Sequence, residues 1–143
     1  MTRIVGGCLC GAIRYRAEEQ TRPVITVVCH ARDCQKLSGS AFAILLAVPK
    51  GKLHFTGPSP SSYTSRDASN LEVTHRFCPH CGSPLVSEMT ATPALVWLKA
   101  GTLDNPSWVR PQANIWCETA LPWVSISEEI PRFLQEMPMG RTG

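Results

Sequence analysis

Two cysteine pairs, each followed by a glycine, are the residues whose spacing best suits chemistry in this chain. The pairs are Cys8 with Cys10 and Cys78 with Cys81, and the glycines are Gly11 and Gly82. Four thiolates at ~2.3 Å from a metal ion make the closed tetrahedral shell of a structural zinc site. A glycine allows a tight turn with positive φ, which lets backbone N–H groups point at the sulfurs. The sequence therefore predicts one structural zinc that joins the N-terminal strand to the middle of the chain.

Two other interpretations of these positions are free buried thiols and a redox disulfide between Cys78 and Cys81. Cys8 and Cys10 are too close in sequence for an easy disulfide. A redox Cys-x-x-Cys pair is typical of a βαβ context, whereas the pattern around residues 78–81 is strand, turn, strand. The chain has seven cysteines, an odd number that would leave one thiol outside a closed disulfide framework. These observations favour zinc.

A second cluster follows the apolar run 24–28, where Cys29, His30 and Cys34 lie close together. A strand end is where binding groups tend to be displayed, and the start of a short helix favours a thiolate at Cys34. Three protein ligands and an open position define a catalytic zinc. Here Cys29 and Cys34 are credible ligands, and His30 is at most the third. The alternative is a metal-free loop with two inert cysteines.

The elements that must position these groups are mostly strands. Apolar residues alternate with polar ones, or form short β-branched runs, and glycine, proline, asparagine and serine separate the runs. The predicted strands cover residues 13–17, 24–28, 41–48, 53–55, 71–77, 85–89, 94–100 and 113–117. One or two short helices are predicted: the first over 33–38, ending at Gly39, and a second that residues 127–137 could form. We therefore expect one mainly β, antiparallel domain over residues 1–143.

The bulk composition excludes several classes of function. The chain has 143 residues, of which 43% are apolar and 17% charged, and its net charge is +3. The basic residues form no run, so neither a nucleic acid nor a membrane surface is an expected partner. No stretch approaches the ~18 apolar residues of a membrane span. We expect a soluble, cytoplasmic protein, in a compartment that keeps thiols reduced.

The order of these motifs resembles the glutathione-dependent formaldehyde-activating family, which includes the centromere protein V group. The matching segments cover most of the chain: 7–12 with Tyr15, 29–30, 34–40, 76–83, 101–104, 115–116 and 122–123. The resemblance implies a zinc-bound β-tent and carbon–sulfur lyase chemistry, in which glutathione adds to formaldehyde to give an S-hydroxymethyl thiol. In the family, the first and last cysteine pairs hold the structural zinc.

The resemblance also implies a second, more labile zinc on three cysteines of a Cys-His-Cys-x-x-Cys run, where glutathione binds. This chain carries Ala31 in place of the middle cysteine, so a second zinc on Cys29 and Cys34 should be weak or absent. We expect Cys29 and Cys34 to be the catalytic residues. The residues expected to hold a thiol such as glutathione are His30, Arg32, Lys36 and Ser38. The alternative function is a non-catalytic, zinc-stapled binding module that has lost the second metal site.

Overall fold

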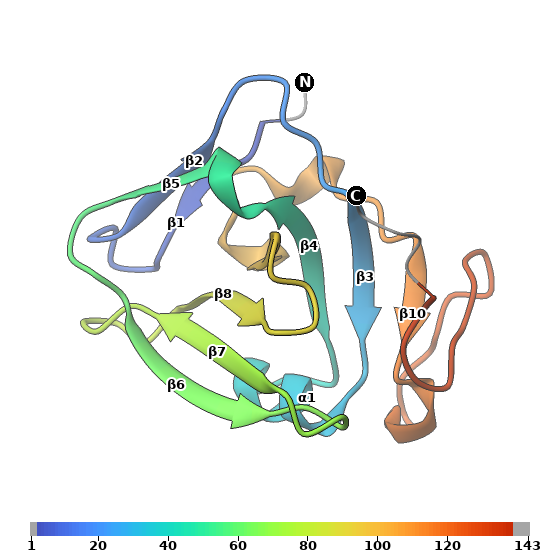
Figure 1. The fold of residues 1–143 in the computed structure, drawn as a ribbon. Helices are drawn as coiled ribbons and strands as arrows, with labels where there is room; N and C mark the ends of the chain where they lie inside the picture. The colour runs from blue at the N-terminus through green and yellow to red at the C-terminus, as the bar shows by residue number, and fades with distance from the viewer. Residues whose placement is uncertain (1–2, 139–143) are drawn as a thin grey trace.

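Ten β-strands in two sheets and one short α-helix make up residues 3–138, the part of the chain that the computed structural model describes (Figure 1). The smaller, antiparallel sheet has the order β1-β2-β5, with β1 Val5–Gly7, β2 Arg14–Ala17 and β5 Leu53–Thr56. The larger sheet has the order β10-β3-β4-β9-β8-β7-β6. Its strands, in that order, are β10 Ala113–Ile115, β3 Ile25–Cys29, β4 Ala43–Pro49, β9 Leu95–Lys99, β8 Pro84–Met89, β7 Glu72–Phe77 and β6 Ser61–Arg66. The prediction of a mainly β fold, the β-tent, is confirmed.

The helix α1, Arg32–Ser38, is the short helix expected over residues 33–38. Gly39 ends it in the left-handed conformation, with φ of 63°, and its N–H donates to the Gln35 carbonyl. Only two residues separate β3 from α1, so the helix turns back over the end of the strand. This short link places Cys34 beside Cys29. Four single-turn helices complete the described elements: η1 Lys50–Lys52, η2 Ala100–Thr102, η3 Pro106–Trp108 and η4 Cys117–Thr119.

The larger sheet is mixed, whereas the sequence pattern predicts a wholly antiparallel domain. Strand β10 pairs in parallel with β3, and the other pairs in this sheet are antiparallel. The pattern also does not predict β1 or β6. Two of the three residues of β1 are glycine, and β6 is a largely exposed polar strand. Neither shows the apolar alternation that indicates a strand.

The prediction of a helix over residues 127–137 is wrong. Pro131 to Gln135 instead runs beside β10: the Asn114 N–H donates to the Pro131 carbonyl at 2.8 Å, and the Phe133 N–H donates to the Asn114 carbonyl at 2.9 Å. The Trp116 N–H donates to the Gln135 carbonyl at 3.0 Å. A helix would leave these groups of the short strand β10 unpaired, and backbone groups in folded proteins are nearly all paired.

Each face of the larger sheet carries its own buried apolar cluster. Successive side chains of a strand point to opposite faces, so one strand contributes to both clusters. The cluster shared with the smaller sheet includes Tyr15, Leu46, Val48, Val86, Val96 and Leu98. The cluster on the opposite face includes Val27, Leu45, Ala47, Trp97, Ala113 and Ile115. The two candidate sites are divided between these two faces.

Tyr15 makes the stability of the fold sensitive to alkaline pH. Its hydroxyl lies 2.7 Å from Thr102 Oγ1, and burial raises the pKa of Tyr15 from 10.0 to about 12. Between these values the unfolded chain releases the proton first, so stability present below pH 10 should be lost as the pH rises. The expected loss is up to about 3 kcal/mol. Denaturant unfolding from pH 9 to 12 measures it, and Tyr15→Phe should lack this component. Parallel pH curves for both proteins would contradict the prediction.

Candidate metal centre and cysteine-lined cavity

The four predicted zinc ligands lie together, although up to 73 positions of sequence separate them. The ligand atoms of Cys8, Cys10, Cys78 and Cys81 all lie within 4.8 Å of one another. Cys10 Sγ is 3.6 Å from Cys8 Sγ and 3.8 Å from Cys78 Sγ. Four sulfurs at ~2.3 Å from one ion form a tetrahedron with edges of about 3.8 Å. The spacing of these sulfurs therefore fits a tetrahedral metal ion, and the cluster can hold one.

Backbone N–H groups point at the sulfurs, as the glycine positions predict. The Ile13 N–H donates to Cys8 Sγ and the His80 N–H donates to Cys78 Sγ, both at 3.3 Å. Gly11 and Gly82 have φ of 79° and 76°, a region that residues with a Cβ rarely occupy. Hydrogen bonds of this kind offset the negative charge of metal-bound thiolates.

Ser83 joins the two cysteine turns. Its hydroxyl oxygen accepts a hydrogen bond from the Leu9 N–H at 2.9 Å and lies 3.2 Å from Cys81 Sγ. The hydroxyl, followed by the backbone N–H groups of Cys10 and of Ser83 itself, lowers the pKa of Cys81 to about 5. Because metal ions bind the thiolate form, this environment favours the metal-binding form of Cys81.

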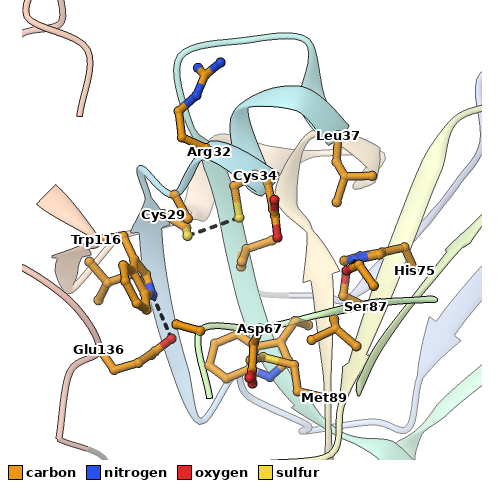
Figure 2. A pocket seen from close by; sticks show the side chains of 18 of the residues that line it. Cys29, Arg32, Cys34, Leu37, Asp67, His75, Ser87, Met89, Trp116 and Glu136 are labelled. Atoms are coloured by element: carbon orange, nitrogen blue, oxygen red, sulfur yellow. Dashed lines mark hydrogen bonds between the residues drawn. The ribbon is translucent and has the colours of Figure 1, made fainter. Parts of the chain in front are cut away.

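A cavity of about 280 Å³ lies on the opposite face of the larger sheet (Figure 2). All seven strands of the larger sheet, the helix α1 and the β6–β7 turn contribute to its lining. The single-turn helix η4 and the C-terminal segment close one side. The apolar part of the wall includes Leu45, Val73, Met89, Trp97, Ile115 and Trp116. Glu136 accepts a hydrogen bond from Trp116 Nε1 at 2.8 Å, which ties the C-terminal segment to this wall. The larger sheet thus lies between this cavity and the four-cysteine cluster.

Cys29 and Cys34 meet in this cavity, with their sulfurs 3.1 Å apart (Figure 2). Both are free thiols, and Cys34 is the less buried of the two. The contact with Cys29 lowers the pKa of Cys34, and the charge of Lys99 adds to the effect. The same contact, with burial, raises the pKa of Cys29. Of the two thiols, Cys34 is therefore the one whose surroundings favour ionisation.

The structure separates the four residues expected to hold a thiol. Arg32 lines the cavity, although its guanidinium donates to Gln35 Oε1 and points away from the two sulfurs (Figure 2). Lys36 and Ser38 lie on α1 outside the cavity lining. His30 is 1% exposed and also lies outside the lining. Its Nε2 is 3.1 Å from Asn114 Oδ1, so its ring serves the contact between β3 and β10.

A second metal would find only two ligands from this chain at Cys29 and Cys34. Within residues 3–138, the cysteine cluster on the other face is the only gathering of three or more metal-ligating side chains. Ala31, which also lines the cavity, carries a methyl group and offers no ligand atom. Because a tetrahedral zinc takes four ligands, a second zinc here stays a prediction that requires ligands from outside the chain.

Sequence reasoning missed a row of polar side chains across the cavity floor: Ser65 on β6, His75 on β7, Ser87 on β8 and Lys99 on β9. His75 Nε2 lies 2.8 Å from Ser65 Oγ, and His75 Nδ1 lies 2.9 Å from Ser87 Oγ. The Lys99 ammonium donates to Ser87 Oγ at 3.1 Å. The signal available in the sequence was a set of polar residues at inward positions of neighbouring strands, above all a lysine that follows the apolar run 95–98.

Fold and sites together define a β-protein with a four-cysteine cluster that can hold a metal ion on one face of its sheet and a dithiol-bearing cavity on the other. The family model of the glutathione-dependent formaldehyde-activating enzyme matches residues 3–119. The chain therefore belongs to this family, as the resemblance of its cysteine motifs predicts.

One solved structure with the same fold is a crystal structure of a Rhodobacter sphaeroides protein determined as a structural genomics target. The two are 18% identical, the match covers 90% of this chain and 98% of that one, and the TM-score is 0.57. This likeness supports the fold alone. None of the curated proteins compared matches the chain. Within residues 3–138, no helix has the length and apolar character needed to cross a membrane.

Proposed function

We propose that this protein is a carbon–sulfur lyase that adds a thiol such as glutathione to an aldehyde, giving an S-hydroxyalkyl adduct. The observation that carries the proposal is the pair of free thiols, Cys29 and Cys34, held 3.1 Å apart in a largely apolar cavity. Membership of the glutathione-dependent formaldehyde-activating family supports the same reaction class. We further propose that the metal of the four-cysteine centre is zinc, because four thiolates in a tetrahedron are typical of structural zinc.

In this proposal Cys34 moves the proton. Its sulfur takes the S–H proton of the incoming thiol, and the resulting thiolate attacks the aldehyde carbon. The carbon–sulfur bond forms while the π electrons of the C=O bond move to oxygen, and Cys34 returns the proton to that oxygen. The reaction is redox-neutral and consumes only the thiol and the aldehyde. Cys29 supports Cys34 by sharing a hydrogen with it. A zinc ion bound at Cys29 and Cys34 would supply one further effect, a lower pKa for a bound thiol.

The direct test follows adduct formation by NMR exchange spectroscopy, with glutathione and either formaldehyde or a larger aldehyde. We expect the protein to equilibrate thiol, aldehyde and adduct faster than the spontaneous reaction does. Calorimetry with glutathione on zinc-loaded protein provides an independent measure of thiol binding. No heat of binding, together with no acceleration for any aldehyde, would rule the proposal out.

A non-catalytic binding module is the second candidate function, and Ala31 is the observation that favours it. Replacing Ala31 by cysteine should give the cavity three thiols and let it retain a second metal ion. Elemental analysis should then find about two zinc ions per chain, one of them easily removed by a mild chelator, against one for the native protein. A new activity in Ala31→Cys that the native protein lacks would identify the native chain as the binding module.

The matched control is Ala31→Ser, because serine is similar in size to cysteine but adds no thiolate. It should keep the metal content of the native protein. A single tightly held zinc ion in Ala31→Cys would show that the cavity does not hold a second metal even with three thiols.

A further inference from the structure

The polar row on the cavity floor has a defined arrangement of protons. The Lys99 ammonium can only donate, so Ser87 Oγ accepts its hydrogen bond, and the Ser87 hydroxyl hydrogen is available to His75 Nδ1. His75 then carries its proton on Nε2, which faces Ser65 Oγ. Burial, and after it the charge of Lys99, lowers the pKa of His75, in agreement with a neutral ring. His75 is thus a positioning residue that holds Ser87 against Lys99.

The Lys99 ammonium has N–H groups that form no hydrogen bond to the described residues. One N–H of its ammonium bonds to Ser87, which leaves two. No carboxylate within residues 3–138 forms a salt bridge with Lys99. Burial lowers the pKa of Lys99, and the charges of Cys34 and Cys29 offset this effect only in part. The cavity is therefore built to receive an oxygen that carries negative charge or develops it.

We propose that Lys99, positioned by Ser87, holds the carbonyl oxygen of the aldehyde, and that this aldehyde carries an uncharged apolar body and is therefore larger than formaldehyde. The attack by a thiol rests on the proposed function. The oxygen site and the preference for an apolar body rest on the cavity itself.

The size and walls of the cavity support the apolar body. Its volume of about 280 Å³ is close to the lower end of the range for small-molecule pockets, about 300–1,000 Å³, whereas formaldehyde has only two heavy atoms. Trp97 and Met89 stand on the same face as the polar row, and Leu45 and Val73 continue that surface. Burying an apolar group stabilises binding by roughly 25 cal/mol per Å², a contribution that formaldehyde cannot make.

The charges around the cavity support an uncharged body. Three carboxylates, those of Asp33, Asp67 and Glu136, line the cavity together with only two basic side chains, Lys99 and Arg32. The guanidinium of Arg32 is engaged with Gln35. A second anionic group on the substrate would therefore meet like charge. The one cation left to receive an oxygen is Lys99.

The spacing across the sheet leaves room for both reactants. Lys99 pairs with Leu45 and Leu45 pairs with Val27, two residues before Cys29. Two strand spacings of ~4.8 Å and two residue rises of ~3.3 Å place the backbones of Lys99 and Cys29 about 12 Å apart. This distance leaves room for an aldehyde whose oxygen contacts Lys99 and whose carbon faces an incoming thiol at Cys34. As the carbon–sulfur bond forms, the electron pair displaced onto oxygen is stabilised by the Lys99 charge, and the Cys34 proton neutralises it.

The test measures the binding of unreactive amides, because an amide carbonyl is a good acceptor that does not react with thiols. 3-Phenylpropanamide should quench the fluorescence of Trp97 and Trp116, which line the cavity, whereas acetamide should bind at least 10-fold more weakly. Lys99→Met, similar in size but without charge, should weaken 3-phenylpropanamide binding at least 10-fold. Lys50→Met is the matched control, since Lys50 is an exposed lysine outside the cavity lining, and it should bind as the native protein does.

Two results would overturn the oxygen site: equal binding of 3-phenylpropanamide by Lys99→Met and the native protein, or equal binding of acetamide and 3-phenylpropanamide by the native protein. If Lys99→Met does not fold, Ser87→Ala replaces it and should weaken binding at least 3-fold, and unchanged binding would again overturn the site. The activity arm compares glutathione addition to 3-phenylpropanal and to formaldehyde, for which we expect kcat/KM to favour the larger aldehyde at least 10-fold. Equal or higher kcat/KM for formaldehyde would overturn the preference for an apolar body.

The two arms separate the two proposals. Amide binding that depends on Lys99, without acceleration of any thiol addition, would remove the proposed reaction and keep the oxygen site. Accelerated addition to formaldehyde, without Lys99-dependent amide binding, would keep the reaction and remove the oxygen site.

Discussion

Replacing Cys78 by serine should cost this protein most of its stability. Cys78 is fully buried and belongs to the apolar cluster between the two sheets. Its loss removes one of four thiolates from the metal centre, and metal binding at such sites contributes directly to folding free energy. We expect a loss of about 5 kcal/mol, comparable with the total stability of many domains. For a chain of this size the corresponding fall in Tm is about 10–20 °C.

Thermal unfolding followed by circular dichroism, together with metal analysis of the purified variant, measures this effect. The matched control is Cys117→Ser, because Cys117 is half-buried and belongs to neither cysteine cluster. That variant should keep its metal and unfold within about 1 kcal/mol of the native protein. If Cys78→Ser melts with the native protein, the four-cysteine centre does not hold the fold together.

Replacing Cys34 by alanine should abolish thiol addition and leave the fold intact. In the proposed reaction Cys34 accepts the proton of the thiol and returns it, and general acid–base groups contribute about 10²–10⁴-fold to a rate. We therefore expect the acceleration over the spontaneous reaction to fall at least 100-fold. Because Cys34 is only partly buried and lies outside the metal centre, the unfolding free energy should change by about 1 kcal/mol or less. Metal content should stay at the native value.

NMR exchange rates for thiol and aldehyde measure this loss, and Cys117→Ala is the control for the removal of a cysteine outside the cavity. A Cys34→Ala variant that accelerates the reaction as well as the native protein would show that Cys34 moves no proton. The pair of variants also separates the two cysteine sites: Cys78→Ser affects folding and metal content, whereas Cys34→Ala affects the reaction alone.

The metal centre was predictable because its chemistry is local in sequence. Each half is a short turn with two cysteines and a glycine, and the tetrahedral preference of a thiolate-bound metal brings the halves together. The same holds for α1, where a left-handed Gly39 follows a short polar segment. Strands of the larger sheet were predictable where apolar residues alternate or run together. β1 and β6 carry no such pattern. Backbone pairing with neighbouring strands, which the residue types do not reveal, holds them in place.

The cavity floor was not predictable, because strand register alone assembles it. Ser65, His75, Ser87 and Lys99 are each 10 to 12 positions from the next, and a one-residue change of register would move any of them to the other face. His30 illustrates the same limit in reverse. Its position beside Cys29 suggests a ligand. Because successive side chains along a strand point to opposite faces, its ring lies beside Asn114 and outside the cavity lining.

The segment that hydrogen-bonds to the edge of β10 lies outside the region that the family model describes, although it forms part of the cavity. The region that the family model describes ends at residue 119, yet Glu136 lies beyond it and lines the cavity beside Trp116. The framework, the metal centre and both cavity thiols thus belong to the part of the chain common to the family model. One side of the cavity belongs to an appended stretch attached by backbone hydrogen bonds. A change at Glu136 would therefore alter the cavity outside the part of the chain that the family model describes.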